Sequence, residues 1–322
     1  MALGEFQLIE RYFRRPPRRH DVQRGVGDDC ALVAPRADSD LAVTVDTLVG
    51  GIHFLVDTEP YGLGHKALAV NLSDLAAMGA EPAWVTLALT LPQAEEAWLD
   101  AFSRGFLALA DRYGVALIGG DTTRGPLSIT VQAMGYVPKR GGMCRSGARP
   151  GDGIYVTGAL GLAGLGLKQL MGRFAGADPD ARLRLERPQP RLAAGAAIRE
   201  IASACIDISD GLAADLGHIL EQSGVAARVD WESLPLPAAV AAYVAVSADW
   251  AMPLTAGDDY ELCFTVAPEW DEELAHRAAT LECPLSRIGT IEKGAGLRLF
   301  RAGFRQQLGG AGYQHFSGSA AP

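Results

Sequence analysis

Cysteine is scarce in this chain and follows no disulfide or metal-binding pattern. The five cysteines are odd in number and contain no C-x-x-C spacing: Cys30, Cys144, Cys205, Cys263 and Cys283. A disulfide framework or a structural zinc site is therefore not expected, and this usage fits a reducing compartment.

Positive charge is also in deficit. The 322 residues include 29 Lys and Arg against 38 Asp and Glu, which gives a net charge of −9, and only four of the basic residues are lysine. Because nucleic-acid binding needs a basic face, no nucleic-acid partner is expected. Two explanations of the acidic excess stay open: an evenly acidic, soluble surface, or carboxylates clustered around bound cations.

Long apolar runs are missing. The first 20 residues hold no signal-type apolar stretch and lead into RRPPRRH, and no segment reaches the roughly 18 apolar residues of a membrane span. We therefore expect a soluble, cytoplasmic protein without a membrane partner.

The common nucleotide and hydrolase motifs are absent as well. The chain has no G-x-x-x-x-G-K-[ST] loop, no kinase H-R-D or D-F-G set, no Rossmann G-x-G-x-x-G and no G-x-S-x-G elbow. The run GALGLAGLG (158–166) follows an expected strand and opens an expected helix. It has two interpretations, a phosphate cradle at the helix N-terminus or close helix–strand packing, and packing is at least as well supported.

What the chain does contain is an alternation of helical and extended hydrophobic patterns. Helices are predicted over 5–13, 65–79, 94–112, from about 160, and over 190–203, 210–222 and 269–281. Strands are predicted over 41–49, 83–92, 115–120, 127–137, 154–158, 205–209, 225–230, 262–267, 285–291 and 297–301. Residues 174–190 are expected to form a surface connection.

A glycine- and proline-rich stretch interrupts this alternation. Residues 138–153 contain five Gly and two Pro. We expect an N-terminal α/β domain at 1–138, a linker at 139–153 and a second domain at 154–322.

Aspartates recur beside glycines at expected strand ends and strand-to-helix turns. They are Asp28, Asp29, Asp121, Asp207, Asp210, Asp258 and Asp259. Any single one of them is also explained as a helix cap or a turn residue. Asp46 inside the strand 41–49 and Asp74 inside an apolar helix have neither explanation. Two carboxylates about 4 Å apart repel by roughly 4 kcal/mol at an effective dielectric of 20, and Mg²⁺ would relieve that repulsion through oxygen ligands.

Together these segments resemble the thiamine-monophosphate kinases, a family of the aminoimidazole-ribonucleotide-synthetase-like superfamily. The similar motifs run from the N-terminus to GYQHF (312–316) in the family's order: GVGDDCA (25–31), TVDTLVGGIHF (44–54), KALAVNLSDLAAMGAEP (66–82), LIGGDTTRG (117–125), RSGARPGD (145–152), DISDGL (207–212) and GDDYEL (257–262). Each motif alone is weak, but the combination is specific.

The resemblance implies a fold and an activity. The implied fold has an N-terminal α/β domain, whose strands build a homodimer interface, and a C-terminal α+β domain. The implied reaction is phosphoryl transfer from ATP to thiamine monophosphate, with several Mg²⁺ ions and the nucleotide held between the domains.

The resemblance also implies site residues. The implied metal ligands are Asp29, Thr44, Val45, Asp46, Asp74, Asp121, Asp207 and Asp210. The implied nucleotide contacts are Gly120, Asp121, Arg145 and Ser209, and the implied substrate contacts are His53, Asp258 and Tyr313. No residue is assigned as a general base, because a phosphate monoester is already largely deprotonated at pH 7, with a second pKa of about 6.

Two positions depart from the family pattern, and several roles have alternatives. Val45 stands where many members have Thr or Ser, so only its backbone carbonyl is available to a metal. Asp258 replaces a common Glu and reaches one methylene less far. Arg145 is also explained as a surface ion pair, and His53 and Tyr313 are also explained by packing.

Two other functions stay open at this point. One is a different ATP-using member of the superfamily, such as an aminoimidazole ribonucleotide synthetase or a selenophosphate synthetase. The latter needs a reactive Cys or selenocysteine near the N-terminal glycines, where this chain has only Cys30 inside GDDCA. The other is a non-catalytic nucleotide-binding protein, which degraded metal positions would favour, but the aspartate set is intact.

Overall fold

The computed structural model describes residues 4–16, 18–176, 178–310 and 312–313. These residues fall into two compact units. The first contains the residues up to Leu75 together with Ala80–Arg140, and the second contains Ala76–Gly79 and the residues from Gly141 on. The separation between Arg140 and Gly141 lies inside the glycine-rich stretch 138–153. The end of the expected second domain, residues 314–322, lies outside the described residues.

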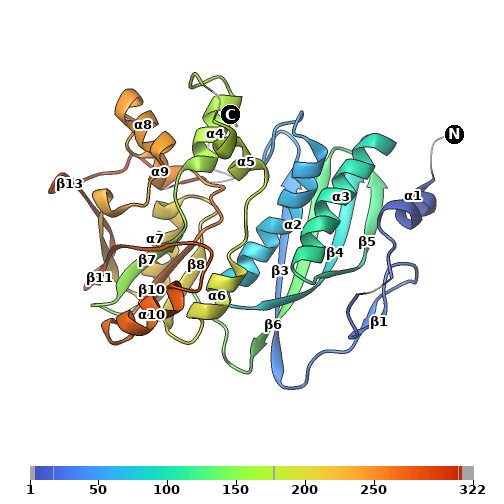
Figure 1. The fold of residues 1–322 in the computed structure, drawn as a ribbon, viewed down its shortest axis with the longest axis horizontal. Helices are drawn as coiled ribbons and strands as arrows, with labels where there is room; N and C mark the ends of the chain where they lie inside the picture. The colour runs from blue at the N-terminus through green and yellow to red at the C-terminus, as the bar shows by residue number, and fades with distance from the viewer. Residues whose placement is uncertain (1–3, 17, 177, 311, 314–322) are drawn as a thin grey trace. The chain divides into compact units, whose positions relative to one another are not determined.

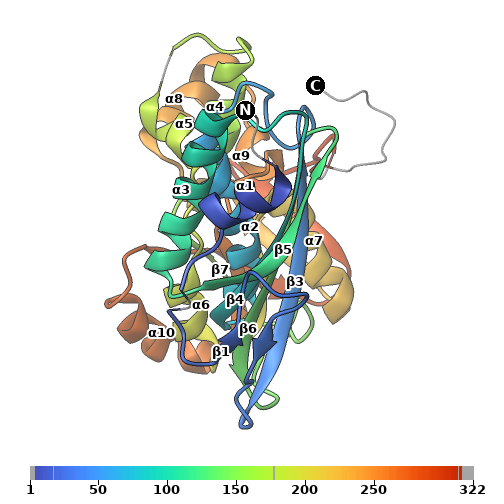
Figure 2. The ribbon, with the colours of Figure 1, turned by 90° about the vertical axis from the view of Figure 1, so that its right-hand side faces the viewer.

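The first unit is a four-stranded sheet with helices on one face (Figures 1 and 2). The strand order is β3 (Ser39–Val49), β6 (Ser128–Pro138), β4 (Glu81–Leu91) and β5 (Ala116–Arg124). Helices α2 (Pro60–Ala77) and α3 (Glu96–Arg112) cover one face, and α1 (Glu5–Tyr12) packs against α3 and β5. A small hairpin of β1 (Val22–Arg24) and β2 (Leu32–Val33) precedes the sheet.

Alternation along β3 explains how this sheet is layered. Thr44, Asp46 and Leu48 point toward α2, whereas Leu41, Val43 and Val45 occupy the intervening positions and are 45–59% exposed. The helix-covered face is densely packed around large, fully buried side chains such as Leu68, Leu72, Phe102 and Phe106. Close packing of α2 on α3 requires glycine, because a Cβ on Gly64 would lie 2.1 Å from the Phe102 carbonyl oxygen.

The second unit is a seven-stranded sheet with helices around a separate core. The strand order is β13 (Phe304–Gln306), β12 (Gly296–Arg301), β9 (Ala226–Asp230), β11 (Leu285–Glu292), β7 (Gly153–Thr157), β10 (Leu262–Val266) and β8 (Ala202–Asp207). The pairing is antiparallel except between β12 and β9. The helices are α4 (Leu162–Leu170), α5 (Pro179–Glu186), α6 (Leu192–Ile198), α7 (Leu212–Ser223), α8 (Ala238–Ser247), α9 (Met252–Thr255) and α10 (Asp271–Ala278), with short 3-10 turns η1 (Trp231–Ser233) and η2 (Pro268–Trp270).

The predicted α/β and α+β fold class is confirmed, with three local corrections. The expected surface connection 174–190 contains α5, which begins where Asp178 caps the amides of Asp180 and Ala181 and Pro179 occupies the first turn. The expected helix 190–203 ends at Ile198, because the chain from Ala202 pairs with β10. Strand β5 continues to Arg124 rather than ending at Gly120, because Asp121–Arg124 pair with β4.

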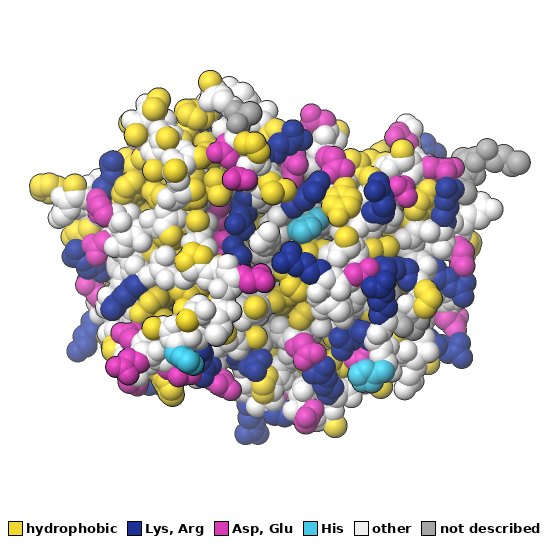
Figure 3. Space-filling model, in the orientation of Figure 1, with side chains coloured by type: hydrophobic (Ala, Val, Ile, Leu, Met, Phe, Trp, Pro, Cys, Tyr) yellow, Lys and Arg dark blue, Asp and Glu magenta, His cyan; other side chains and the backbone are white. Residues whose placement is uncertain are grey.

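The excess of acidic side chains does not form a single patch on the face of the molecule that Figure 3 shows. On the face shown in Figure 3, the described acidic and basic side chains are interspersed. No described helix has the length and apolar character needed to cross a membrane.

Candidate active site

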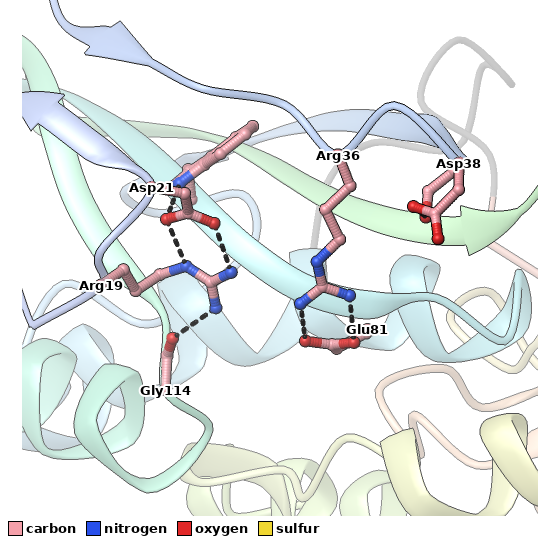
Figure 4. A network of polar contacts seen from close by, with 8 residues as sticks. Arg19, Asp21, Arg36, Asp38, Glu81 and Gly114 are labelled. Carbon is pink, nitrogen blue, oxygen red and sulfur yellow. Dashed lines mark hydrogen bonds and ion pairs between the residues drawn. The ribbon is translucent and has the colours of Figure 1, made fainter.

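The first acidic motif is carried by a hairpin that is fastened to the sheet by a buried carboxylate (Figure 4). Asp21 is only 6% exposed and accepts two hydrogen bonds from the Arg19 guanidinium, at 3.0 and 2.7 Å, and one from the Trp84 indole at 3.1 Å. Arg19 also donates to the Gly114 carbonyl oxygen, and the Asp21 carbonyl oxygen accepts the Ala34 N–H at 2.8 Å. Asp21 therefore connects both ends of the segment 22–33 to the rest of the first unit.

The GVGDD loop at the tip of this hairpin is polar and exposed. Asp28 pairs with Arg24 at 2.7 Å and accepts the Asp29 N–H at 3.1 Å. These two contacts, the backbone N–H first, hold the pKa of Asp28 below its usual value. The Asp29 side chain is exposed. Gly27 has φ +120°, and a Cβ there would lie 3.2 Å from the Arg14 guanidinium, so glycine suits the turn.

Strand β3 and helix α2 bring three of the predicted metal ligands together. The Thr44 hydroxyl donates to the Asp74 carboxylate, and both side chains are half-buried. The Asp46 N–H donates to the buried Asn71 amide oxygen at 3.1 Å, and Asn71 in turn donates to the Ala67 carbonyl oxygen. This explains why Asp74 interrupts an apolar helix: its turn of α2 faces the polar positions of β3.

Val45 belongs to β3, and His53 belongs to the turn that follows this strand. The Val45 side chain occupies the opposite face of β3 from Asp46 and is 59% exposed. His53 closes the turn after β3. Its ring Nδ1 accepts the backbone N–H of Val49 at 2.9 Å, and its backbone N–H donates to the Val49 carbonyl oxygen. Since Nδ1 is an acceptor, the neutral imidazole carries its proton on Nε2.

Gly120 and Asp121 lie inside β5, and the sequence-based placement of Asp121 at a strand end was wrong. Asp121 pairs with Ala88 of β4, and the β-branched Thr122 and Thr123 continue the ladder. Gly120 has φ +155°, and a Cβ there would lie 1.8 Å from the Leu87 carbonyl oxygen. Only glycine fits at this position.

In the second unit, four predicted site residues lie together around one turn. The Asp258 N–H donates to the Ser209 carbonyl oxygen at 2.9 Å, and the Tyr313 N–H donates to the Asp210 carbonyl oxygen at 3.2 Å. Asp258 has a φ of +69°, a conformation that non-glycine residues adopt only when neighbouring contacts hold them. Backbone hydrogen bonds thus join the turn after β8 and the GDDYE loop into one platform.

Sequence reasoning missed the residue that shapes this turn, Asp215. Its side chain is 3% exposed and accepts the N–H groups of Asp210 and Gly211 at 3.1 Å each. Burial, and then the nearby Asp210 charge, raise the pKa of Asp215 to about 7. An acid in the first turn of the helix after S-D-G was the available signal. Asp207, the last residue of β8, is also buried.

Two further acids of the GDDYEL motif are structural. Asp259 is fully buried and accepts the Gly161 N–H at 2.8 Å, and burial raises its pKa to about 8. Glu261 is 0% exposed and binds the Arg191 guanidinium through two 2.6 Å contacts and the Thr157 hydroxyl through a third. Nothing in the sequence distinguishes these two buried acids from the half-buried Asp258 of the same motif.

Asp259 also decides between the two interpretations of GALGLAGLG. The Gly161 amide at the start of α4 is occupied by the Asp259 carboxylate, so it offers no free cradle to a phosphate. The glycines instead permit close packing: a Cβ on Gly164 would lie 2.4 Å from Ala256 Cβ, and one on Gly166 would lie 2.4 Å from the Ala181 carbonyl oxygen. The packing interpretation fits the structure.

Arg145, the remaining predicted nucleotide contact, lies on the stretch before β7. Its side chain is exposed, and its carbonyl oxygen accepts the Ser223 hydroxyl at 3.4 Å. The same hydroxyl oxygen accepts the N–H groups of Gly147 and Ala148, at 3.2 Å each. Ser223 therefore fixes the backbone that presents Arg145.

The predicted metal ligands are distributed over both units. Asp29, Asp46, Asp74 and Asp121 belong to the first unit, and Asp207 and Asp210 belong to the second. Among the described residues, no group of three or more His, Cys, Asp or Glu is arranged to hold a metal ion. The convergence of the full set on shared cations stays a prediction.

Comparison with known proteins places this pair of units in a family. The chain matches the AIR synthase related protein family, its N-terminal domain over residues 27–137 and its C-terminal domain over residues 149–301. A thiamine-monophosphate kinase of Salmonella typhimurium is 49% identical over 324 residues, which cover 98% of this chain and 99% of the relative. The chain belongs to the thiamine-monophosphate kinase family. The resemblance inferred from the motifs is thereby confirmed.

Solved structures of thiamine-monophosphate kinases share the fold. The enzyme from Stenotrophomonas maltophilia aligns with a TM-score of 0.85 at 49% identity, over 93% of this chain and 97% of that chain. AaThiL, solved in complex with AMPPCP and TMP, aligns with a TM-score of 0.77 at 31% identity, over 91% of this chain and 93% of that chain.

Proposed function

We propose that this member of the thiamine-monophosphate kinase family transfers the γ-phosphoryl group of ATP to thiamine monophosphate, giving thiamine diphosphate and ADP. The observation that carries the proposal is the 49% identity with a thiamine-monophosphate kinase along 98% of the chain. AaThiL, a structural neighbour, was solved with AMPPCP and TMP together. The named relatives do not favour the two alternative functions.

We further propose that several Mg²⁺ ions bind among the acidic residues. The donor set consists of oxygens, as hard cations require: Asp29, Thr44, the Val45 backbone, Asp46, Asp74, Asp121, Asp207 and Asp210. The contact between the Thr44 hydroxyl and the Asp74 carboxylate supports this fit, because it places two such oxygens side by side. Bound Mg²⁺ would neutralise phosphate charge that these carboxylates alone would repel.

In this proposal the protein positions the reactants and removes no proton. The acceptor is a phosphate monoester with a second pKa of about 6, so its attacking oxygen is already largely deprotonated at pH 7. Direct in-line transfer then depends on orientation and on charge stabilisation. No side chain needs the role of general base.

Specific residues would hold the two substrates. His53 would donate from Nε2 to the thiamine phosphate, because Nδ1 is occupied by the Val49 N–H. Asp258 and Tyr313 would contact the same substrate from the platform around Ser209 and Asp210. Gly120, Asp121, Arg145 and Ser209 would contact the nucleotide.

We also propose a homodimer formed through the first unit. Leu41, Val43 and Val45 line one face of the edge strand β3 and are 45%, 53% and 59% exposed. A contiguous apolar stripe on a sheet is typical of an interface between subunits.

A cytoplasmic location is proposed too. It fits the free thiols of Cys205 and Cys263, which are buried in the second unit.

The function is tested by incubating the protein with ATP, Mg²⁺ and thiamine monophosphate and separating the products by chromatography. We expect thiamine diphosphate and ADP in equal amounts. Free thiamine serves as the control acceptor and should give neither product. Hydrolysis of ATP without thiamine diphosphate would overturn the proposal.

A further inference from the structure

Arg145 is exposed, and its backbone belongs to a segment of the second unit that other residues hold in place. No described residue forms a hydrogen bond or an ion pair with its guanidinium. The surface ion pair that would explain this arginine without a ligand is therefore not formed within the described part of the chain. The question is what holds the backbone from which the side chain extends.

The two ends of this segment are fixed independently of each other. At its start, the Cys205 N–H of β8 donates to the Cys144 carbonyl oxygen at 2.9 Å. At its end, the buried Asp152 carboxylate accepts the Arg149 N–H at 2.9 Å. Gly147 lies so close to β8 that a Cβ there would be 2.3 Å from a backbone oxygen of the strand.

Between these two points, one hydroxyl holds the chain. The Ser223 Oγ accepts the N–H groups of Gly147 and Ala148 at 3.2 Å each, and it donates to the Arg145 carbonyl oxygen at 3.4 Å. Ser223 is the last residue of α7 and is half-buried. Three backbone groups of residues 145–148 thus share a single side chain as their partner.

Helix α7 does not need this hydroxyl for its own end. Gly224 has a left-handed conformation with φ +66°, and its N–H donates to the Glu221 carbonyl oxygen at 3.2 Å. The Val225 N–H donates to the Leu220 carbonyl oxygen at 3.0 Å. These backbone bonds close the helix without a side chain, so the Ser223 hydroxyl serves the segment 145–148.

We propose that Ser223 is a positioning residue for nucleotide binding, which acts by holding the backbone that presents Arg145. The inference rests on the proposed function, in which Arg145 contacts the nucleotide. A long arginine side chain loses rotamer freedom when it binds a ligand, and a backbone that is already fixed adds no further ordering cost. Without the hydroxyl, the segment 145–148 has to be ordered when the nucleotide binds.

The test is a double-mutant cycle on nucleotide affinity. Ser223→Ala, Arg145→Ala and the double variant are titrated with AMPPCP and Mg²⁺ in a calorimeter, and Ser223→Thr tests whether a retained hydroxyl restores binding. The matched control is Ser247→Ala, at the last residue of α8, where the hydroxyl accepts the Asp249 N–H at 3.2 Å and donates to the Tyr243 carbonyl oxygen at 2.8 Å. Thiamine monophosphate affinity and the unfolding midpoint are measured for each variant.

The expected result is a loss that depends on Arg145. Ser223→Ala should weaken AMPPCP at least about threefold, the size of effect that the loss of a neutral hydrogen bond produces. Arg145→Ala should weaken it more, and the double variant should bind no worse than Arg145→Ala alone. Ser223→Thr and Ser247→Ala should bind AMPPCP as the wild type does, and every variant should keep its affinity for thiamine monophosphate.

Three results would overturn the positioning role. The first is wild-type affinity for AMPPCP in Ser223→Ala or in Arg145→Ala. The second is an equal effect of Ser223→Ala with and without Arg145, because Ser223 would then act by another route. The third is a matching loss of thiamine monophosphate affinity together with a lowered unfolding midpoint.

Binding and turnover are measured separately, so the two proposals fail in different ways. A wild-type protein that binds AMPPCP but makes no thiamine diphosphate would refute the proposed function. The double-mutant cycle would still show whether Ser223 acts through Arg145.

Discussion

Removing the Asp21 carboxylate should loosen the hairpin that carries the first acidic motif. Asp21→Ala deletes the acceptor for three side-chain hydrogen bonds and leaves the Arg19 guanidinium and the Trp84 indole N–H without it. The side chains of the ion pair, Arg19 and Asp21, are 14% and 6% exposed. The perturbation therefore removes one half of a buried pair rather than a surface contact.

The size of the effect follows from that burial. Deleting one partner of a buried ion pair costs about 3–5 kcal/mol. Because Arg19 keeps some access to water and a bond to the Gly114 carbonyl oxygen, we expect a value near the lower end, about 3 kcal/mol. Such a loss raises the opening equilibrium of the segment 22–33 by roughly 100-fold.

The same pair predicts the direction of a pH dependence. Burial alone would raise the pKa of Asp21, but the hydrogen bonds from Arg19 and Trp84 outweigh it and the pKa is lowered. A lowered folded-state pKa means that the stabilisation is present above about pH 4 and is lost as the pH falls through the folded-state value. Asp21→Ala should remove this acid sensitivity.

Hydrogen–deuterium exchange of peptides covering 22–33 measures the opening directly. The matched control is Asp38→Ala, an exposed acid near Arg36 in the same view, which should change stability by no more than about 0.5 kcal/mol. If these peptides exchange as slowly in Asp21→Ala as in Asp38→Ala, Asp21 does not hold the hairpin.

Three other predictions address the metal set, a buried acid and the proposed interface. Asp74→Asn keeps an acceptor for the Thr44 hydroxyl and should retain the circular dichroism spectrum of the wild type while turnover falls at least about tenfold; unchanged kinetics would remove Asp74 from the site. Burial raises the pKa of Asp259 to about 8, so stability should fall as pH rises from about 4 to that value. Asp259→Asn should flatten this fall in the unfolding midpoint, and an unaltered profile would contradict the assignment. Val43→Glu places a charge on the exposed stripe of β3 and should shift the light-scattering mass from dimer to monomer; a persistent dimer would place the interface elsewhere.

The sequence predicted those elements whose pattern is local. The alternation in 41–49 and the apolar helix around Asp74 have strong periodicity, and both appear within a few residues of the expected limits. The odd polar positions Asp46 and Asp74 were informative for the same reason, since a strong pattern makes its exceptions visible.

Elements that depend on distant partners were not predictable. The extension of β5 to Arg124 follows from its pairing with β4, and the early end of the helix after Arg191 follows from the pairing of β8 with β10. Helix α5 has a mixed, charged sequence without a clear apolar stripe, so only the Asp178–Pro179 cap marked its start.

Burial separates acids that look alike in sequence. Asp258 and Asp259 are neighbours, yet one is half-buried in the platform with Ser209 and the other is buried as a cap of α4. The identity of an acid as ligand, cap or ion-pair partner depends on which segment packs over it. That information is tertiary, and it explains why Asp215 and Glu261 were missed.

Phosphoryl transfer to thiamine monophosphate is observed directly when the transferred phosphorus is labelled. The protein is given ATP labelled in the γ-phosphoryl group together with Mg²⁺ and thiamine monophosphate. We expect the label to appear in the terminal phosphate of thiamine diphosphate, with one ADP formed for each product. Label recovered only as inorganic phosphate would show that the protein hydrolyses ATP instead of phosphorylating thiamine monophosphate.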